Sequence, residues 1–251
     1  MSSKTQIEWT EQTWNPTTGC TKVSPGCKHC YAEALSIRLK AMSTSGYDNG
    51  FELSIMEDRV EQPLKRKIPT TYFVNSMSDL FHEGIPDKFL DKIMGVINKT
   101  PQHTYQILTK RSERMREYFH GRDVPKNAWL GVSVEDKEHG VPRIDHLRDI
   151  DATIRFLSAE PLLEDLGIMN LTNIHWVIVG GESGPKARPM KEEWVDNIQE
   201  QCDSYDSAFF FKQWGGWGVD GKKRAKKENG RLLKGRTWDE MPQQPDIALP
   251  L

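Results

Sequence analysis

Residues 128–134 read Ala-Trp-Leu-Gly-Val-Ser-Val, an apolar run without regular alternation of polar and apolar side chains. Such a run is typical of a strand buried on both faces, as the strands of a parallel sheet are. Similar runs lie at 71–75, 105–109, 154–158, 174–179 and 208–211, with a further candidate at 11–15. The starts of the six clear runs are roughly 20 to 34 residues apart, which leaves room for a helix in each connection.

The connecting segments contain helical patterns, at residues 86–98, 112–119 and 191–202. Alternating strands and helices predict an α/β fold. At most seven strands favour a partial (β/α)6 TIM-like barrel with parallel strands over a complete eightfold barrel, and a flat doubly wound sheet is the alternative. We expect the barrel to occupy residues 1–214, and residues 215–251 to form a basic C-terminal extension, rich in Gly, Trp and Lys, that packs on or near it.

The composition excludes a membrane protein, because the mean hydropathy is −0.65 and no apolar run approaches the roughly 18 residues that a span needs. The 34 Lys and Arg side chains against 36 Asp and Glu give a net charge of −2, so any nucleic-acid site must be local. Residues 1–11 are polar and lack the apolar core of a signal peptide. We therefore expect a cytoplasmic protein without a membrane partner.

Polar residues lie at the carboxyl end of every clear predicted strand. Ligands bind at these ends in parallel α/β folds. These residues predict a polar cup at one edge of the sheet. The candidate site residues at these strand ends are Ser76, Ser78, Asp79, Lys110, Ser133, Glu135, Glu160, Glu182 and Lys212. Structural roles are open to the same residues: the serines and Asp79 as caps of helices or turns, and Glu135 and Glu160 as partners of arginines in salt bridges.

Three of the four cysteines, Cys20, Cys27 and Cys30, have the spacing C-x6-C-x2-C after the first candidate strand. A cluster of this kind in a cytosolic protein indicates metal binding or catalysis more than disulfides. Structural zinc takes four ligands, and the fourth would have to be His29 or Cys202. His29 lies between two of the cysteines, and Cys202 falls on a distant helix. Three local thiolates favour a [4Fe–4S] cluster with one open iron, and zinc is the alternative.

A three-cysteine loop after the first strand of a partial barrel resembles the radical S-adenosylmethionine (SAM) enzymes. Their usual spacing is C-x3-C-x2-C with an aromatic residue before the last cysteine, whereas the first gap here is six residues and His29 takes the aromatic position. The chain is also similar to an uncharacterised radical-SAM-like family common in phages and prophages. The residues that carry this second resemblance are 14–16, 75–81, 108–111, 131–135, 158–162, 179–184, 212–216 and 235–242.

Among characterised enzymes, the strand ends are most similar to those of the spore photoproduct lyases, which repair a thymine dimer in DNA. This resemblance implies that three irons are bound by the three cysteines and the fourth by the amine and carboxylate of SAM. The implied SAM contacts are Ser76 or Ser78 with Asp79 for the amine, Lys110 for the carboxylate, and Ser133 with Glu135 for the ribose, with His29 beside the cluster. No role in amine binding is transferred to Gly180-Gly181-Glu182, because this motif follows the sixth strand.

The resemblance also implies the reaction. One electron from the reduced cluster cleaves SAM to methionine and a 5′-deoxyadenosyl radical, which takes a hydrogen atom from an unreactive C–H bond. It implies an electron donor such as flavodoxin or ferredoxin as a partner.

Residues 212–236 contain nine basic and two acidic residues, and the run 222–227 lies between Trp217 and Trp238. Basic groups interleaved with aromatic ones suit phosphate contact and base stacking, although a solvated hairpin has the same composition. The predicted substrate contacts are Glu160, Glu182, Lys212, Trp217, Arg224 and Trp238.

The sequence thus predicts a radical SAM enzyme that modifies a nucleic-acid base or a base-linked group, as in hypermodification of DNA pyrimidines in phages. One alternative is a zinc-stabilised nucleic-acid-binding protein without catalysis. The other is a radical enzyme that acts on a peptide or a small metabolite, with the basic extension as a lid.

Overall fold

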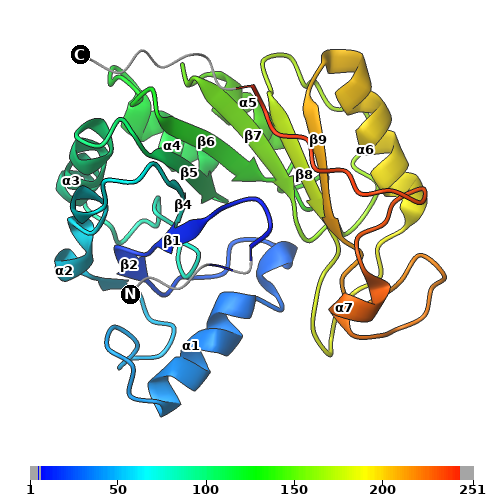
Figure 1. The fold of residues 1–251 in the computed structure, drawn as a ribbon, viewed down its shortest axis with the longest axis horizontal. Coiled ribbons are helices and arrows are strands. Elements are labelled where there is room, and N and C mark those ends of the chain that lie inside the picture. Colours follow the sequence, from blue (N-terminus) through cyan, green and yellow to red (C-terminus); the bar gives the residue numbers. More distant parts are fainter. Residues whose placement is uncertain (1–4, 6, 244–251) are drawn as a thin grey trace.

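The structure is a computed structural model, and the residues described are 5 and 7–243. Its centre is a seven-stranded sheet in the order β1-β4-β5-β6-β7-β8-β9, and all neighbouring strands are parallel. The strands are β1 (Gln12–Trp14), β4 (Thr71–Val74), β5 (Thr104–Thr109), β6 (Ala128–Ser133), β7 (Ile154–Ala159), β8 (Trp176–Gly180) and β9 (Ala208–Gln213). Figure 1 shows a curved, open sheet, so the predicted partial barrel is confirmed.

The helices lie mainly in the connections between these strands (Figure 1). They are α1 (Tyr31–Ala41), α2 (Glu57–Val60), α3 (Asp87–Asn98), α4 (Ser112–Phe119), α5 (Pro142–Arg148), α6 (Glu192–Tyr205) and α7 (Lys226–Asn229). A small antiparallel pair, β2 (Thr17–Thr18) and β3 (Ser54–Ile55), lies within the connection from β1 to β4. Among the described residues, no helix is both long and apolar enough to cross a membrane.

The two faces of the sheet pack differently. One face carries alternate strand residues such as Leu130 and Val132, which join the apolar side chains of α3, α4, α5 and α6 in the main core. The other face carries an aromatic layer without helix residues, formed by Trp9, Phe73, Trp129, Ile154, Phe156, Trp176, Ile178 and Phe210. This layer therefore fills the inner, concave side of the half-barrel. Gly131 permits the packing, because a Cβ there would lie 2.5 Å from the ring of Phe156.

The segment after β9 returns along this edge strand. Phe211 N donates to Trp238 O at 3.0 Å, and Trp176 Nε1 donates to Glu240 O at 2.9 Å. The first of these contacts uses a backbone N–H group of β9 that an open sheet edge would leave unpaired. Residues 244–251 of the expected extension lie outside the described part of the chain.

Candidate functional site

A polar layer lies above the aromatic layer, at the carboxyl ends of the inner strands. Side chains two residues apart on a strand share a face, so Ser133 and Lys212 follow Gly131 and Phe210 on the inner side. Ser133 and Ser158 are partners in the β6–β7 register. Glu160 accepts a hydrogen bond from Ser158 Oγ at 3.3 Å and pairs with Lys212 Nζ at 3.0 Å. The structure thus brings these predicted residues together.

The three-cysteine loop begins at Gly19, whose φ of +78° lies in the left-handed region that favours glycine. A Cβ at this position would lie 2.1 Å from Glu52 O. The loop passes through a short 3-10 helix at Pro25–Cys27 and ends at Cys30, directly before α1. Cys20, Cys27 and Cys30 are free thiols, each partly exposed.

The additional residues in the first cysteine gap attach the loop to the sheet. Thr21 Oγ1 accepts hydrogen bonds from Arg111 Nη2 at 2.8 Å and from His82 Nε2 at 3.0 Å. His82 Nε2 carries the proton, because Nδ1 of the same ring accepts from Gly84 N. Ser24 Oγ donates to Glu135. The loop is therefore held by residues that follow three different strands.

Glu135 is fully buried beneath this loop. Its carboxylate lies 2.6 Å from Arg143 Nη1 and 3.7 Å from Lys110 Nζ. A Cβ on Gly26 would lie 2.5 Å from the Glu135 Oε1 atom, so the loop backbone sits directly on the carboxylate. Burial alone would raise the pKa of Glu135, but Lys110, Arg143 and the hydrogen bond from Ser24 together hold it below its ordinary value. Glu135 is a buried anion that joins two cations and the loop.

Asp79 is buried and accepts four hydrogen bonds. Its Oδ1 atom accepts from Phe81 N at 3.0 Å and Thr109 Oγ1 at 2.7 Å. Its Oδ2 atom accepts from Lys110 N at 3.0 Å and Arg111 Nη1 at 3.1 Å. The carboxylate that was expected to face the amine of SAM thus holds together the residues that follow β4 and β5.

The two predicted serines after β4 have local partners as well. Ser78 Oγ donates to Thr17 O at 2.9 Å, and Ser76 Oγ donates to Asn15 Oδ1 at 3.2 Å. These bonds join the loop after β4 to the segment before the cysteines. The two contacts are structural, but they are not helix or turn caps, because each joins residues 61 positions apart.

Arg111 follows β5 directly after Lys110, and no role at the site was predicted for it from the sequence. Its Nη1 atom donates to Cys20 Sγ at 3.4 Å, and the side chain is buried. Burial raises the pKa of the Cys20 thiol to about 11 and Asp79 adds to this effect, whereas Arg111 opposes it. The only signal in the sequence was its position directly after Lys110, which gives no information on the contact with a cysteine 91 residues away.

Glu182 lies on the other side of the cup, in the loop after β8. Arg188 donates to it from Nε at 2.9 Å and from Nη2 at 2.6 Å. Burial alone would raise the pKa of Glu182, but Arg188 and the nearby His29 lower it below its ordinary value. The interaction with His29 places this loop near the three-cysteine loop.

The predicted residues of the extension do not gather at one point. Trp217 Nε1 donates to Ala187 O at 2.7 Å, beside the Glu182 loop. Arg224 is paired with Asp220. Trp238 packs against Phe209, with 5.6 Å between ring centroids, and Phe209 belongs to the helix-covered core. Trp238 therefore lies on the outer side of the sheet, away from the cup.

Cys202 is separate from the other thiols. It lies on α6, is completely buried, and belongs to the main core. Burial raises the pKa of this thiol. In the described part of the chain, no three side chains of His, Cys, Asp or Glu form a ready-made site for a metal ion. This finding includes the three thiols of the loop, so the structure does not gather Cys20, Cys27 and Cys30 into such a site.

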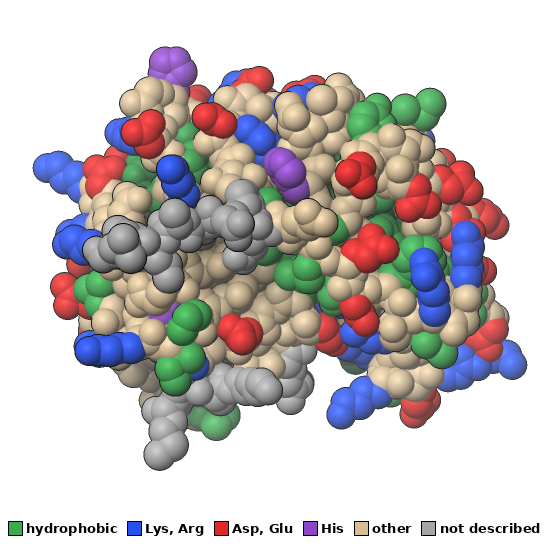
Figure 2. Space-filling view, turned by 45° about the horizontal axis from the view of Figure 1, so that its top comes forward, with side chains coloured by type: hydrophobic (Ala, Val, Ile, Leu, Met, Phe, Trp, Pro, Cys, Tyr) green, Lys and Arg blue, Asp and Glu red, His purple; other side chains and the backbone are tan. Residues whose placement is uncertain are grey.

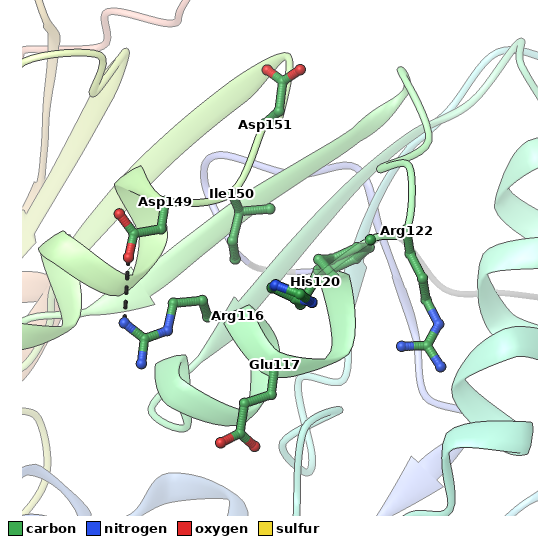
Figure 3. Close-up of a pocket in the computed structure, with 9 residues that line it drawn as sticks. Arg116, Glu117, His120, Arg122, Asp149, Ile150 and Asp151 are labelled. Carbon is green, nitrogen blue, oxygen red and sulfur yellow. Dashed lines mark hydrogen bonds and ion pairs between the residues drawn. The ribbon is translucent and has the colours of Figure 1, made fainter.

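A cavity of about 780 Å³ lies at the opposite edge of the sheet, where the chain leaves α4 and α5. Figure 3 shows Arg116 of this cavity paired with Asp149, at 3.3 Å. His120, Arg122 and Asp151 also line it. It contains none of the predicted site residues, and its mixed charges are already partly paired.

Solved structures of spore photoproduct lyase are similar to this chain. One variant of that enzyme has a TM-score of 0.51 and 10% sequence identity, over 83% of this chain and 78% of the lyase chain. The complex with dinucleoside spore photoproduct has a TM-score of 0.47 and 12% identity, over 82% of this chain. The protein spans 64% of the lyase chain in that complex. At these identities the comparison shows the fold, a half-barrel like that of the lyase.

A search of curated proteins finds no match. The family model described as "Protein of unknown function (DUF5131)" matches residues 4–242. Because this match includes nearly the whole chain, the protein belongs to the DUF5131 family.

Proposed function

We propose that the protein is a radical SAM enzyme and that Cys20, Cys27 and Cys30 hold a [4Fe–4S] cluster. The observation that carries this proposal is the position of three free thiols on one loop, held above the polar end of a half-barrel. The chemistry that such a cluster supplies when bound is the one-electron cleavage of SAM into methionine and a 5′-deoxyadenosyl radical.

The donor set suits a cluster better than a single zinc ion. In a cluster each thiolate binds a different iron, whereas structural zinc gathers four ligands around one ion. The fourth cysteine is buried in the core on α6 and is not available to the loop. Three thiolates leave one iron for a ligand from SAM.

The cup supplies a cation and a hydroxyl group for two parts of SAM. Lys110 Nζ is the cation near the loop that we assign to the carboxylate, and Glu135 holds it in place at 3.7 Å. Ser133 lies on the inner face, opposite Ser158 in the β6–β7 register, and is assigned to the ribose. Asp79 already accepts four hydrogen bonds, so we assign it to support of Arg111 and Lys110 instead of the amine.

The test is anaerobic reconstitution with iron and sulfide, followed by metal analysis and addition of dithionite and SAM. We expect about four iron and four sulfide per chain and formation of 5′-deoxyadenosine. Cys27→Ala should lose both. Cys202→Ala is the matched control and should keep both, because its thiol lies in the core. A colourless protein with one zinc and no 5′-deoxyadenosine would instead support the binding protein without catalysis.

We further propose a nucleic-acid base, or a group linked to one, as the substrate. The support is the basic extension beside the cup, since Gly216 N donates to Glu182 O at 2.8 Å. Figure 2 shows Lys and Arg side chains gathered at the lower right, where α7 lies in Figure 1. The reaction would draw its electron from a donor such as flavodoxin or ferredoxin.

Removal of exposed cations from the extension should weaken binding to single-stranded DNA. Lys222 and Lys227 are exposed, whereas Arg224 is engaged with Asp220. In the double variant Lys222→Ala/Lys227→Ala, the slope of log K against log salt should fall by roughly 0.7 for each lost phosphate contact. The control Lys88→Ala/Lys126→Ala removes two exposed cations elsewhere. Equal affinity and slope in both variants would remove the support for a nucleic-acid substrate and favour a peptide or a small metabolite.

A further inference from the structure

Arg111 uses all five of its N–H donors within one small region. Nε donates to Glu83 at 2.9 Å, and Nη2 donates to the carbonyl of Thr21 at 3.1 Å and to its hydroxyl at 2.8 Å. Nη1 donates to Asp79 at 3.1 Å and to Cys20 Sγ at 3.4 Å. A guanidinium group has five N–H donors in a fixed planar arrangement. The four other contacts therefore fix the guanidinium group so that its fifth N–H group points at Cys20 Sγ.

The guanidinium cannot easily move away from this sulfur. Its side chain is 4% exposed, and Asp79 behind it is fixed by Thr109 and by two backbone N–H groups. The planar group reaches the residue after Cys20 as well as the cysteine itself. Arg111 thus fixes both the place and the hydrogen bonding of the first thiol of the loop.

We propose that Arg111 is a positioning residue that holds Cys20 for the cluster and raises the reduction potential of that cluster through its hydrogen bond to Cys20 Sγ. This inference rests on the proposed function. A donor to a ligating sulfur stabilises the more electron-rich, reduced form, and hydrogen bonds to the sulfurs are among the factors that set cluster potentials. Reduction takes up one electron, which comes from dithionite in the experiment below.

The experiment measures the midpoint potential of the reconstituted cluster by redox titration followed by electron paramagnetic resonance. Arg111→Lys keeps a positive charge but loses the planar set of donors. Arg111→Gln/Asp79→Asn removes both members of the buried ion pair, so that no carboxylate is left buried without a partner. Arg116→Lys on α4 is the matched control, because this arginine lies at the opposite edge of the sheet. Circular dichroism establishes that each variant is folded.

Both Arg111 variants should make reduction about tenfold less favourable, which is about 59 mV for one electron, while Arg116→Lys should match the wild type. Folded Arg111 variants that bind less iron would also support the inference, because Cys20 would then be misplaced. An unchanged potential with full iron content in both variants would overturn it. A wild-type chain that binds no cluster would refute the proposed function itself, so the two failures are distinguishable.

Discussion

Glu135→Gln is expected to lower the free energy of unfolding by about 3 kcal/mol at pH 7. The carboxylate is fully buried and lies 2.6 Å from Arg143 and 3.7 Å from Lys110. Loss of its charge leaves two cations near each other without their common anion, and a buried ion left unpaired is costly. Urea unfolding at pH 7 measures the effect. Glu113→Gln is the control, since this exposed carboxylate is 4.0 Å from Arg116 and should change stability by less than about 0.5 kcal/mol.

The same variant should show a distinct dependence on pH. The pKa of Glu135 in the folded protein lies below its ordinary value of 4.5, so the ion pair stabilises the fold fully above that pH. This stabilisation is lost as the pH falls through the lower, folded pKa. Protonated Glu135 resembles Gln, so the difference between wild type and variant should shrink on acidification below 4.5. A difference that stays constant between pH 7 and pH 3.5 would show that Glu135 does not act through its charge.

Gly19→Ala is expected to destabilise the fold by about 3 kcal/mol and to lower the iron content of the reconstituted protein. The backbone φ is +78°, and the new Cβ would meet Glu52 O at 2.1 Å. That oxygen belongs to the backbone and cannot turn away, so the start of the three-cysteine loop must shift. Because Cys20 is the next residue, its thiol shifts as well. Thermal unfolding and iron analysis measure the two effects.

Gly95→Ala provides the control for this substitution. Gly95 lies within α3, and apart from its chain neighbours and the backbone of its own helix, no heavy atom lies within 4 Å of the position its Cβ would take. Alanine should therefore stabilise the protein by about 0.5–1 kcal/mol through helix propensity. If Gly19→Ala behaved like Gly95→Ala, the close approach to Glu52 would not constrain the loop.

The sheet was predictable because the signal for each strand is local. Runs such as 128–134 and 208–211 are apolar without alternation, and burial on both faces is the physical cause of that pattern. The sequence also predicted helices at 86–98 and 191–202, which are observed at Asp87–Asn98 and Glu192–Tyr205. The helix α1 was not predicted, and its apolar residues Leu35 and Ile37 are exposed, so it lacks the apolar face from which helices are identified.

The cup was predictable in outline, because parallel strands bring their carboxyl ends to one edge. The hydrogen bonds and ion pairs within the cup were not predictable. Glu135 and Ser24 are 111 residues apart, and Arg111 and Cys20 are 91 residues apart. No periodic pattern encodes such pairs, since they depend on the register of the sheet and on the path of the loops.

By itself, the sequence determined the buried strands of an α/β fold, the polar edge and the three thiols, because burial and ligand type are properties of single segments. Only the tertiary structure decided which polar groups are already engaged with protein partners. In the structure, Asp79 accepts a hydrogen bond from Arg111, and Trp238 lies on the outer face against Phe209. The reason is physical: a buried polar group must find its hydrogen-bond partners in three dimensions, and those partners come from segments that are distant along the chain.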